Sequence, residues 1–354
     1  MEKQTGASDA APAYQLPEGW PAASIGAIKQ ALCAPGARFE METVEIRGVP
    51  TRVWKNALPS LPDLARHARA THPDRLFTIY EDERVTYDAW FRATATLAAE
   101  LARSGVKPGD RVALSMRNLP EWPVAFFAIT SLGAIAVPLN AWWTGAELAY
   151  GLSDSGACAL ICDAERWERI APVMGELPGL DTVLVSRSDV PLAAPARRLE
   201  DVIGAPSGYG TLGDTDLPSM GLEPDTYATI FYTSGTTGHP KGALGTHRNI
   251  LTNIFSSAYS GARTLARRGE VPPDPVPKTM LTVIPLFHVT ACNAALMGAI
   301  FAGNTMVFMR KWDPVDAFRI IEREKVNVTG GVPTIAWQLI EHPDREKYDL
   351  SSLE

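Results

Sequence analysis

The sequence predicts an α/β protein with two packed α/β subdomains and largely parallel sheets. From residue 76 onward, short runs rich in β-branched and aromatic residues alternate with helical runs, as in parallel sheets covered by helices. The expected strands are apolar along their whole length, which is typical of strands buried on both faces. A chain of 354 residues is also too long for one small core.

The first subdomain is expected over residues 76–225. Local capping signals predict where its helices begin: Thr144 and Glu147 are spaced as a capping box, and Asp163 is placed as an N-cap. The expected strands are 76–80, 111–116, 135–138, 159–162 and 182–185, and the expected helices are 87–103, 120–132 and 144–153.

The second subdomain is expected over residues 226–354, after a linker at about 187–226 that is rich in Pro, Gly, Ser and Asp. Thr246 is placed as an N-cap, and Asp313 followed by Pro314 marks another helix start. Residues 267–278 are expected to form a basic, proline-rich loop. The expected strands are 227–232, 280–284, 305–309 and 326–328, and the expected helices are 246–257, 290–302, 313–324 and 334–341.

The N-terminal region is expected to contain a flexible tail over 1–25 and a segment, 26–75, that packs on the second subdomain. The tail lacks the apolar core of a signal peptide, so a cytoplasmic location is expected. Residues 122–146 and 279–309 are uncharged and longer than the ~20 residues that span a bilayer. Pro and Gly interrupt both stretches, which favours buried core over a transmembrane segment. Peripheral membrane contact and the oligomeric state stay open.

Composition argues against several other classes. The formal net charge is −7 and basic residues gather only in pairs, so no nucleic-acid-binding surface is expected. The four cysteines lack the spacing of a zinc site, and Cys158 and Cys162 are expected to share one face of a core strand. The run Gly208–Gly213 matches G-x-G-x-x-G, but a broken, proline-rich context surrounds it where a strand and a helix are required.

Residues 232–242 read Tyr-Thr-Ser-Gly-Thr-Thr-Gly-His-Pro-Lys-Gly and follow an apolar strand, at whose carboxyl end α/β sheets bind ligands. Glycines allow close approach of the backbone to an anion, hydroxyls add neutral donors, and Lys241 adds a mobile positive charge. The segment therefore predicts a polyphosphate-binding loop, although Gly242 stands where a Walker A motif needs Ser or Thr. The candidate binding residues are Thr233, Ser234, Gly235, Thr236, Thr237, Gly238 and Lys241.

This segment resembles the signature Y-T-S-G-T-T-G-x-P-K-G of the acyl-activating, or adenylate-forming, enzymes. That family includes acyl-CoA synthetases, aryl-CoA ligases, luciferases and peptide-synthetase adenylation domains. Other family segments are matched in the right order from about Leu61 to the end: Val85–Tyr87, Gly133–Asn140, Pro285–His288 and Gly331–Thr334. In look, the sequence is most similar to the N-terminal part of fatty acyl-CoA synthetases.

The resemblance implies two half-reactions: a carboxylic acid is adenylated by ATP with Mg²⁺, and the acyl group then passes to coenzyme A. It implies that Lys241 and His288 are catalytic, with His288 beside the carboxylate. No metal-ligating residue is assigned. Phe287-His288-Val289-Thr290 differs from the F-D-x-S of amino-acid-activating domains, which favours an acid without an α-amino group, a fatty acid above all. The apolar helix that follows is compatible with an acyl tunnel wall or with plain core.

The family's adenine-contacting segment, ribose-binding Asp, hinge and C-terminal domain with its catalytic lysine are not among these residues. We therefore expect an N-terminal part of a longer ligase, inactive or partly active by itself. Two alternatives stay open. One is a CoA ligase for an aryl or sterol-side-chain acid, and the other is a non-catalytic module that binds a nucleotide or an acyl group.

Overall fold

The computed structural model describes residues 19–233, 238–271 and 276–354. The chain divides into two compact units, one made of Met1–Asn56 and Phe255–Asp274 and the other of Ala57–Ile254 and Pro275–Glu354. The larger unit has the predicted α/β architecture with largely parallel sheets. Within the described ranges, no helix combines the length and the apolar character needed to cross a membrane.

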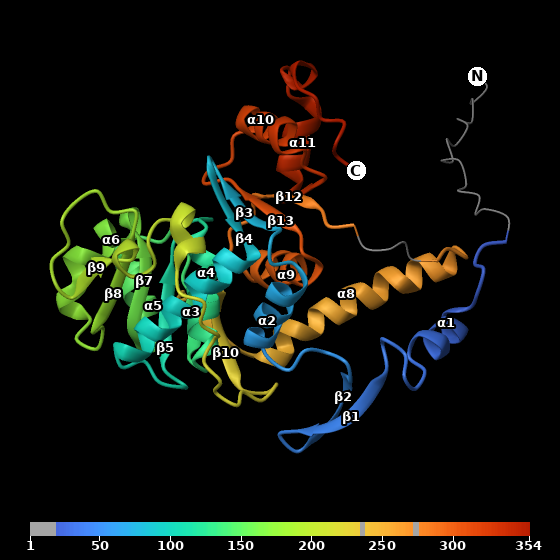
Figure 1. Cartoon of the computed structure of the whole chain (residues 1–354), viewed down its shortest axis with the longest axis horizontal. Coiled ribbons are helices and arrows are strands. Elements are labelled where there is room, and N and C mark those ends of the chain that lie inside the picture. The colour runs from blue at the N-terminus through green and yellow to red at the C-terminus, as the bar shows by residue number, and fades with distance from the viewer. Residues whose placement is uncertain (1–18, 234–237, 272–275) are drawn as a thin grey trace, which may run out of the picture. The chain divides into compact units, whose positions relative to one another are not determined.

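A seven-stranded sheet lies in the larger unit, with strand order β11-β10-β6-β5-β7-β8-β9. Neighbouring strands pair in parallel except β10 and β11, which are antiparallel. Figure 1 shows β7, β8 and β9 with α5 and α6 beside them. The strands are β5 (Arg111–Ser115), β6 (Ile135–Pro138), β7 (Ala157–Asp163), β8 (Thr182–Ser186), β9 (Ala196–Arg198), β10 (Tyr227–Thr233) and β11 (Lys241–Thr246).

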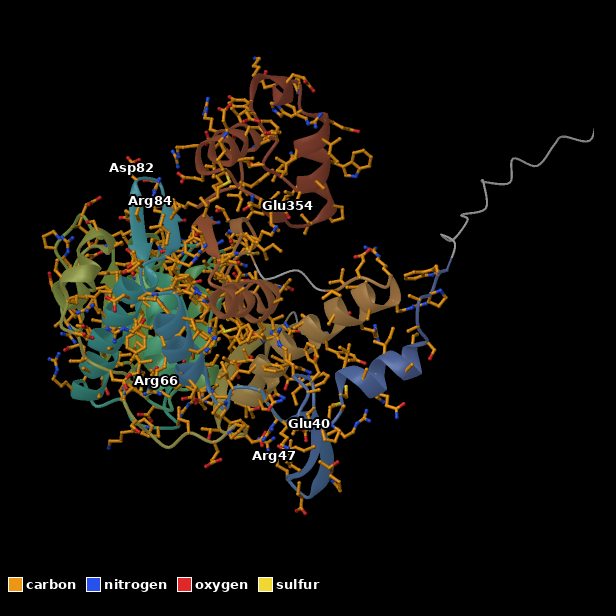
Figure 2. The ribbon with its side chains drawn as sticks, turned by 45° about the vertical axis from the view of Figure 1, so that its right-hand side comes forward. Glu40, Arg47, Arg66, Asp82, Arg84 and Glu354 are labelled. Atoms are coloured by element: carbon orange, nitrogen blue, oxygen red, sulfur yellow. The ribbon has the colours of Figure 1, made fainter. Side chains whose placement is uncertain are left out.

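A five-stranded sheet has the order β14-β12-β13-β3-β4, and only β3 and β4 pair antiparallel. The β3–β4 hairpin carries Asp82 and Arg84 at its tip (Figure 2), and Arg84 Nη2 lies 2.7 Å from Glu324 Oε1. The strands are β3 (Leu76–Tyr80), β4 (Glu83–Thr86), β12 (Thr279–Thr282), β13 (Thr305–Phe308) and β14 (Val328–Gly330).

The two sheets interleave along the sequence. Strands β3 and β4 precede the seven-stranded sheet in the chain, but β3 pairs with β13, which follows that sheet, and β4 pairs with β3. Strands β10 and β11 follow the expected linker but join the sheet that precedes it. The expected linker at about 187–226 therefore lies within one sheet, since it contains β9 and is flanked in the chain by β8 and β10. The expected division of the chain into subdomains at this linker stays a prediction.

Several helices of the larger unit begin where local capping predicts. Thr144 and Glu147 form the complete capping box of α5, and the side chains of Asp163 and Asp313 accept backbone N–H groups at the starts of α6 and α10. Most predicted element ends lie within two residues of the observed ones. The helices are α2 (Leu61–Thr71), α3 (Tyr87–Arg103), α4 (Glu121–Ser131), α5 (Gly145–Ser155), α6 (Ala164–Ile170), α7 (Glu200–Ile203), α9 (Met297–Ala302), α10 (Pro314–Glu324) and α11 (Pro333–Glu341).

Helix α4 accounts for the first part of the long uncharged stretch at residues 122–146. Each of its residues is buried, and it contacts β5, β6, α2 and α3. The ring of Trp122 stacks on that of Phe126 at 5.2 Å, and Phe127 contacts Trp90 of α3 edge to face at 5.0 Å. A helix that is apolar on every side is thus covered by protein on every side.

Helix α8 (His247–Arg267) continues ten residues beyond the predicted end at 257. Its final part belongs to the smaller unit, together with α1 (Ile25–Leu32), β1 (Met41–Ile46) and β2 (Val49–Trp54). There the ring of Tyr259 contacts Phe39 at 5.6 Å and Trp54 at 5.4 Å, and Trp54 Nε1 donates to Ser256 Oγ at 3.1 Å. These partners are about 200 positions away in sequence, so the local pattern gave no sign of them.

The structure also bears on the G-x-G-x-x-G run and on the two cysteines expected in a core strand. Gly208–Gly213 lies mostly in a short 3-10 helix, Pro206–Thr211, that holds the buried Tyr209, so it is not a strand-to-helix nucleotide motif.

Cys162 is buried in the core, but Cys158 is only half-buried, because the β5–β7 register skips it at a bulge and interrupts the period of two.

Candidate active site

The candidate phosphate loop joins two neighbouring antiparallel strands. Strand β10 ends at Thr233 and β11 begins at Lys241, and these two residues are register partners. Thr233 Oγ1 donates to the Lys241 carbonyl at 3.4 Å. Ser234, Gly235, Thr236 and Thr237 lie outside the described residues. The structure therefore brings together the residues at the two ends of the loop.

Strand β11 was not predicted, because its sequence contains Gly242 and Gly245, and glycine is depleted in strands. The packing explains both. A Cβ on Gly242 would lie 2.7 Å from Ile230 Cγ2, and one on Gly245 would lie 2.8 Å from Thr229 Oγ1. Gly238 has φ +98°, a conformation that residues with side chains rarely adopt. The motif's glycines thus serve the close pairing of β11 with β10 and the turn before it.

Helix α5 braces both ends of the loop. Tyr232 Oη donates to Asp154 Oδ2 at 2.6 Å, and Tyr150 Oη donates to the Pro240 carbonyl at 3.1 Å. The Tyr150 ring also stacks on His239 at 5.1 Å. Burial and the neighbouring Asp154 raise the pKa of Tyr232, so its phenol stays a protonated donor at neutral pH. The loop is therefore anchored to α5 near each of its two ends.

Lys241 itself is exposed, and its ammonium group forms no ion pair with any residue in the described ranges. Its side chain is thus available to an anionic ligand. In the same ranges, no three His, Cys, Asp or Glu side chains gather as a metal site requires.

His288 lies on the five-stranded sheet's side of the unit, in the segment that follows β12. Its backbone N–H donates to the Pro285 carbonyl at 3.0 Å and closes a turn. The backbone N–H of Thr290 donates to His288 Nδ1 at 3.2 Å. Because Nδ1 accepts, the neutral imidazole carries its hydrogen on Nε2 and offers a donor there. The side chain is exposed, and among the described residues no hydrogen bond joins it to the phosphate loop.

The helix after His288 differs from the prediction of one continuous α-helix over 290–302. Residues Thr290–Leu296 are π-helical, and α9 follows from Met297. Ala291, Cys292 and Leu296 are buried, whereas Ala294 is exposed. Short π-helical segments occur often at functional sites. The choice between a tunnel wall and plain core stays open.

A cleft of about 530 Å³ lies at the carboxyl ends of β5, β6, β12 and β13 and beside α11, and Val283, Ile284 and Pro285, which precede His288, line part of it. Such an edge is where α/β sheets bind ligands. The residues that define its character are apolar (Trp142, Met309 and Trp312) and cationic (Arg117, Arg310 and Lys311). Sequence analysis missed this cleft, although Met309 is the last residue of an expected strand and the other five residues follow closely after one.

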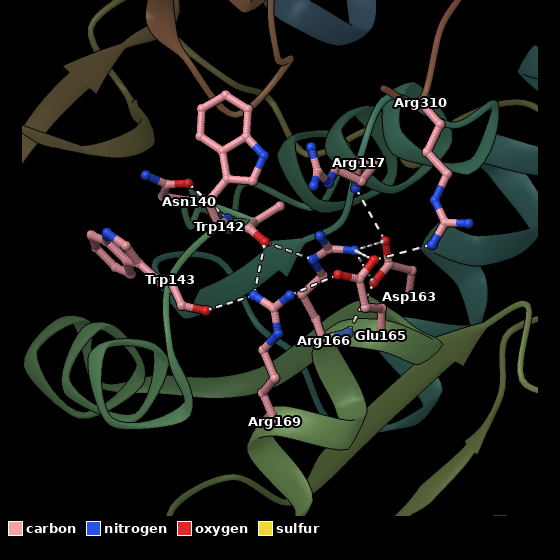
Figure 3. Close-up of polar contacts among 10 residues, drawn as sticks. Arg117, Asn140, Trp142, Trp143, Asp163, Glu165, Arg166, Arg169 and Arg310 are labelled. Atoms are coloured by element: carbon pink, nitrogen blue, oxygen red, sulfur yellow. Dashed lines mark hydrogen bonds and ion pairs between the residues drawn. The ribbon is translucent and has the colours of Figure 1, made fainter. Parts of the chain in front are cut away.

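Arginines organise the loop after β6, as Figure 3 shows. Arg166 is fully buried, pairs with Asp163 at 2.9 Å, and donates from Nε to the Ala141 carbonyl at 2.8 Å. Arg169 donates to the Trp143 carbonyl at 2.9 Å. These bonds fix the backbone on both sides of Trp142.

Trp142 in turn contacts the His288 segment. Its ring meets Phe287 edge to face, with centroids 5.2 Å apart. The guanidinium of Arg117 lies over the Trp142 ring, 5.4 Å from the ring centroid. Burial, followed by repulsion from Arg166, lowers the pKa of Arg117. The loop after β6 therefore supports both the cleft and the segment that carries His288.

Comparison with known proteins agrees with this geometry. The family described as AMP-binding enzyme matches residues 64–354. A propanoyl:CoA ligase of Mycobacterium tuberculosis, whose acyl group carries a methylated dioxo-octahydro-indenyl ring, is 34% identical over 79% of this chain and 53% of its own length. The long-chain-fatty-acid–CoA ligase of Bacillus subtilis is 28% identical over 83% of this chain and 54% of its own length.

Solved structures of similar fold include acyl-CoA ligases as well. The N-terminal domain of FACL13 from Mycobacterium tuberculosis is 26% identical and superposes with a TM-score of 0.69, covering 84% of this chain and 69% of that one. A long-chain-fatty-acid CoA ligase from Rhodopseudomonas palustris, described as putative, gives 26% identity and a TM-score of 0.68 over 83% of this chain and 68% of that one. The chain spans about half the length of the curated relatives it matches. Since the family match covers residues 64–354, the chain belongs to the AMP-binding enzymes, the family that the phosphate-loop signature predicts.

Proposed function

We propose that the protein activates a carboxylic acid with ATP and passes the acyl group to coenzyme A. The observation that carries this proposal is the loop between Thr233 and Lys241, which has the family signature and is braced by α5 at the carboxyl end of a sheet strand. The relatives named above are CoA ligases by their printed names.

The proposed reaction has two steps. A carboxylate oxygen attacks the α-phosphorus of Mg-ATP, an acyl–phosphate bond forms, and the bond to the β-phosphate breaks with its electron pair leaving on pyrophosphate. The thiolate of coenzyme A then attacks the acyl carbon, and AMP leaves. Charge grows on the departing pyrophosphate in the first step, so donors fixed around it stabilise the transition state.

Each candidate residue has a role in the first step. The backbone and hydroxyls of Thr233, Ser234, Gly235, Thr236, Thr237 and Gly238 hold the β- and γ-phosphates, and Lys241 neutralises their growing charge. His288, with Nε2 as the donor, orients the carboxylate that attacks. A hydrogen bond there keeps the oxygen in line with phosphorus without removing a proton, since the acid is already ionised at neutral pH.

The acid is proposed to be a fatty acid. Phe287 and Val289 flank His288 without a carboxylate that could pair with a substrate ammonium group, and the following segment is apolar. A CoA ligase for an aryl or ring-bearing acid is the second candidate, favoured by the feruloyl-CoA synthase of Amycolatopsis at 32% identity over 76% of this chain and 48% of its own length and by the indenyl-acid ligase. A cytoplasmic location and possible peripheral membrane contact remain predictions.

A Lys241→Ala substitution tests the proposal in the full-length enzyme. It is expected to slow acid-dependent exchange between ATP and labelled pyrophosphate by roughly 10²–10³, the scale for losing one preorganised donor. The matched control is Lys107→Ala, another exposed lysine without an ion pair in the described ranges. Exchange near the wild-type rate in Lys241→Ala would refute the assignment, and no acid-dependent exchange in the wild type would favour a non-catalytic module. The chain 1–354 alone is expected to make no acyl-CoA.

A further inference from the structure

One side chain fastens the segment that leads to His288. Asn118 follows β5 of the seven-stranded sheet, and its Nδ2 donates to the carbonyls of Thr282 at 3.3 Å and Ile284 at 3.0 Å. Its Oδ1 accepts the backbone N–H of Leu286 at 2.8 Å. All three partners lie 164–168 positions away in sequence: Thr282 ends β12 of the other sheet, and Ile284 and Leu286 follow it. A single amide therefore uses both its donors and its acceptor on one short stretch of backbone.

Burial makes the three hydrogen bonds of Asn118 costly to lose. Asn118 is only 4% exposed, and Leu286 is fully buried. In such a place an unmatched backbone group costs about 1–3 kcal/mol, so the segment is held to the register in which all three bonds form. Leu286 lies inside the turn from Pro285 to His288, and this turn sets the position of the His288 side chain.

We propose that Asn118 is a positioning residue for His288. By fixing the backbone from Thr282 to Leu286, it sets the turn that presents the imidazole and keeps Nδ1 in reach of the Thr290 N–H. Trp142, through Phe287, supports the same segment from the neighbouring loop. The effect of Asn118 on the reaction rests on the proposed function, whereas its effect on the imidazole does not.

The competing explanation is that Asn118 only joins the two sheets. A second, half-buried contact provides a matched control for that role. Arg187, which directly follows β8 of the seven-stranded sheet, donates to Glu83 of β4 at 2.7 Å and to Glu121 of α4 at 2.8 Å. It joins the same sheets but has no recorded contact with the segment from Thr282 to Thr290 in the described residues.

The informative substitution is Asn118→Asp, which keeps the shape of the side chain but removes both donors. Its carboxylate would face the carbonyl oxygens of Thr282 and Ile284, so the segment must move away. Asn118→Ser is the milder variant, since it leaves room for a water and introduces a hydroxyl in place of the amide. Arg187→Lys is the control, because it loses the guanidinium fork and keeps the charge.

Nitrogen-labelled histidine gives a readout in the chain 1–354 without any substrate. The chain has six histidines, and His288→Gln identifies the signal of interest. In the wild type, nitrogen shifts should show the tautomer with hydrogen on Nε2. In Asn118→Asp or Asn118→Ser they should move toward those of a freely exchanging imidazole, whereas Arg187→Lys should leave them unchanged. A folded Asn118→Ser protein with the wild-type His288 signal would overturn the proposal, and so would an equal change in Arg187→Lys.

Kinetics of the full-length enzyme test the consequence for the reaction. Asn118→Ser should lower the acid-dependent kcat/KM of pyrophosphate exchange by about 10²-fold, the scale for misplacing a group by about 1 Å, with the KM for ATP within about threefold. Equal losses for acid and ATP would show a merely structural role. If the wild type shows no acid-dependent exchange, the proposed function fails, while the imidazole signal still decides whether Asn118 positions His288.

Discussion

Burial of His247 makes the stability of the larger unit depend on pH. This first residue of α8 is fully buried, and its Nδ1 accepts the backbone N–H of Leu61 at 3.1 Å. Nε2 has no partner among the described residues. Protonation would place a hydrogen on Nδ1 against that N–H and a charge in the core. Burial therefore lowers the pKa of His247 to about 4, although nearby Asp63 opposes the change.

The size and direction of the effect follow from linkage. An unfolded histidine has a pKa of about 6.5, so between about pH 6.5 and pH 4 the unfolded chain binds a proton that the folded chain does not. This contribution to stability is complete above that window and is lost as the pH falls through it. The loss relative to pH 7 is about 2 kcal/mol at pH 5 and about 3 kcal/mol at pH 4.

The matched variant is His247→Asn, whose Oδ1 takes the place of Nδ1 as the acceptor for the Leu61 N–H. It should be less stable at pH 7, because the missing ring leaves a cavity, but it lacks the titration of the imidazole. Urea unfolding followed by tryptophan fluorescence at pH 7, 6, 5 and 4 gives both free energies. The wild type should lose about 3 kcal/mol more than His247→Asn between pH 7 and pH 4. Parallel losses in the two proteins would refute the argument.

Two further predictions concern the site. Gly242→Ala should lower the free energy of unfolding by about 1–3 kcal/mol, because the new methyl would lie 2.7 Å from Ile230 Cγ2. Thermal unfolding measures this loss. Gly261→Ala is the control: a Cβ there meets nothing within 4 Å, so the change should be neutral or stabilising. His288→Ala in the full-length enzyme should slow the acid-dependent step while nucleotide affinity, measured by calorimetry, stays within a few-fold; a parallel loss of nucleotide affinity, or of the folded state, would indicate a structural role instead.

Sequence alone was sufficient where the decisive interactions are local. The capping box of Thr144 and the N-caps of Asp163 and Asp313 involve groups two or three residues apart, and the structure confirms all of them. The alternation of apolar strands with helices predicted the α/β class for the same reason, since burial of both strand faces leaves its trace in each strand. The phosphate-loop signature is also contiguous, and it predicted the family.

Tertiary structure decided what depends on distant partners. Residues of β11 form a strand because they pair with β10, whose side chains approach the glycines of β11 too closely for a Cβ. Helix α8 extends to Arg267, and its Tyr259 ring contacts Phe39, which lies far away in the chain. The assignment of β3 and β4 to the second sheet, and the reach of Asn118 to the segment before His288, join positions more than 160 residues apart. Such contacts leave no periodic signal in the sequence, because they join segments far apart in the chain and their free energy is gained only once the long intervening loop has been closed.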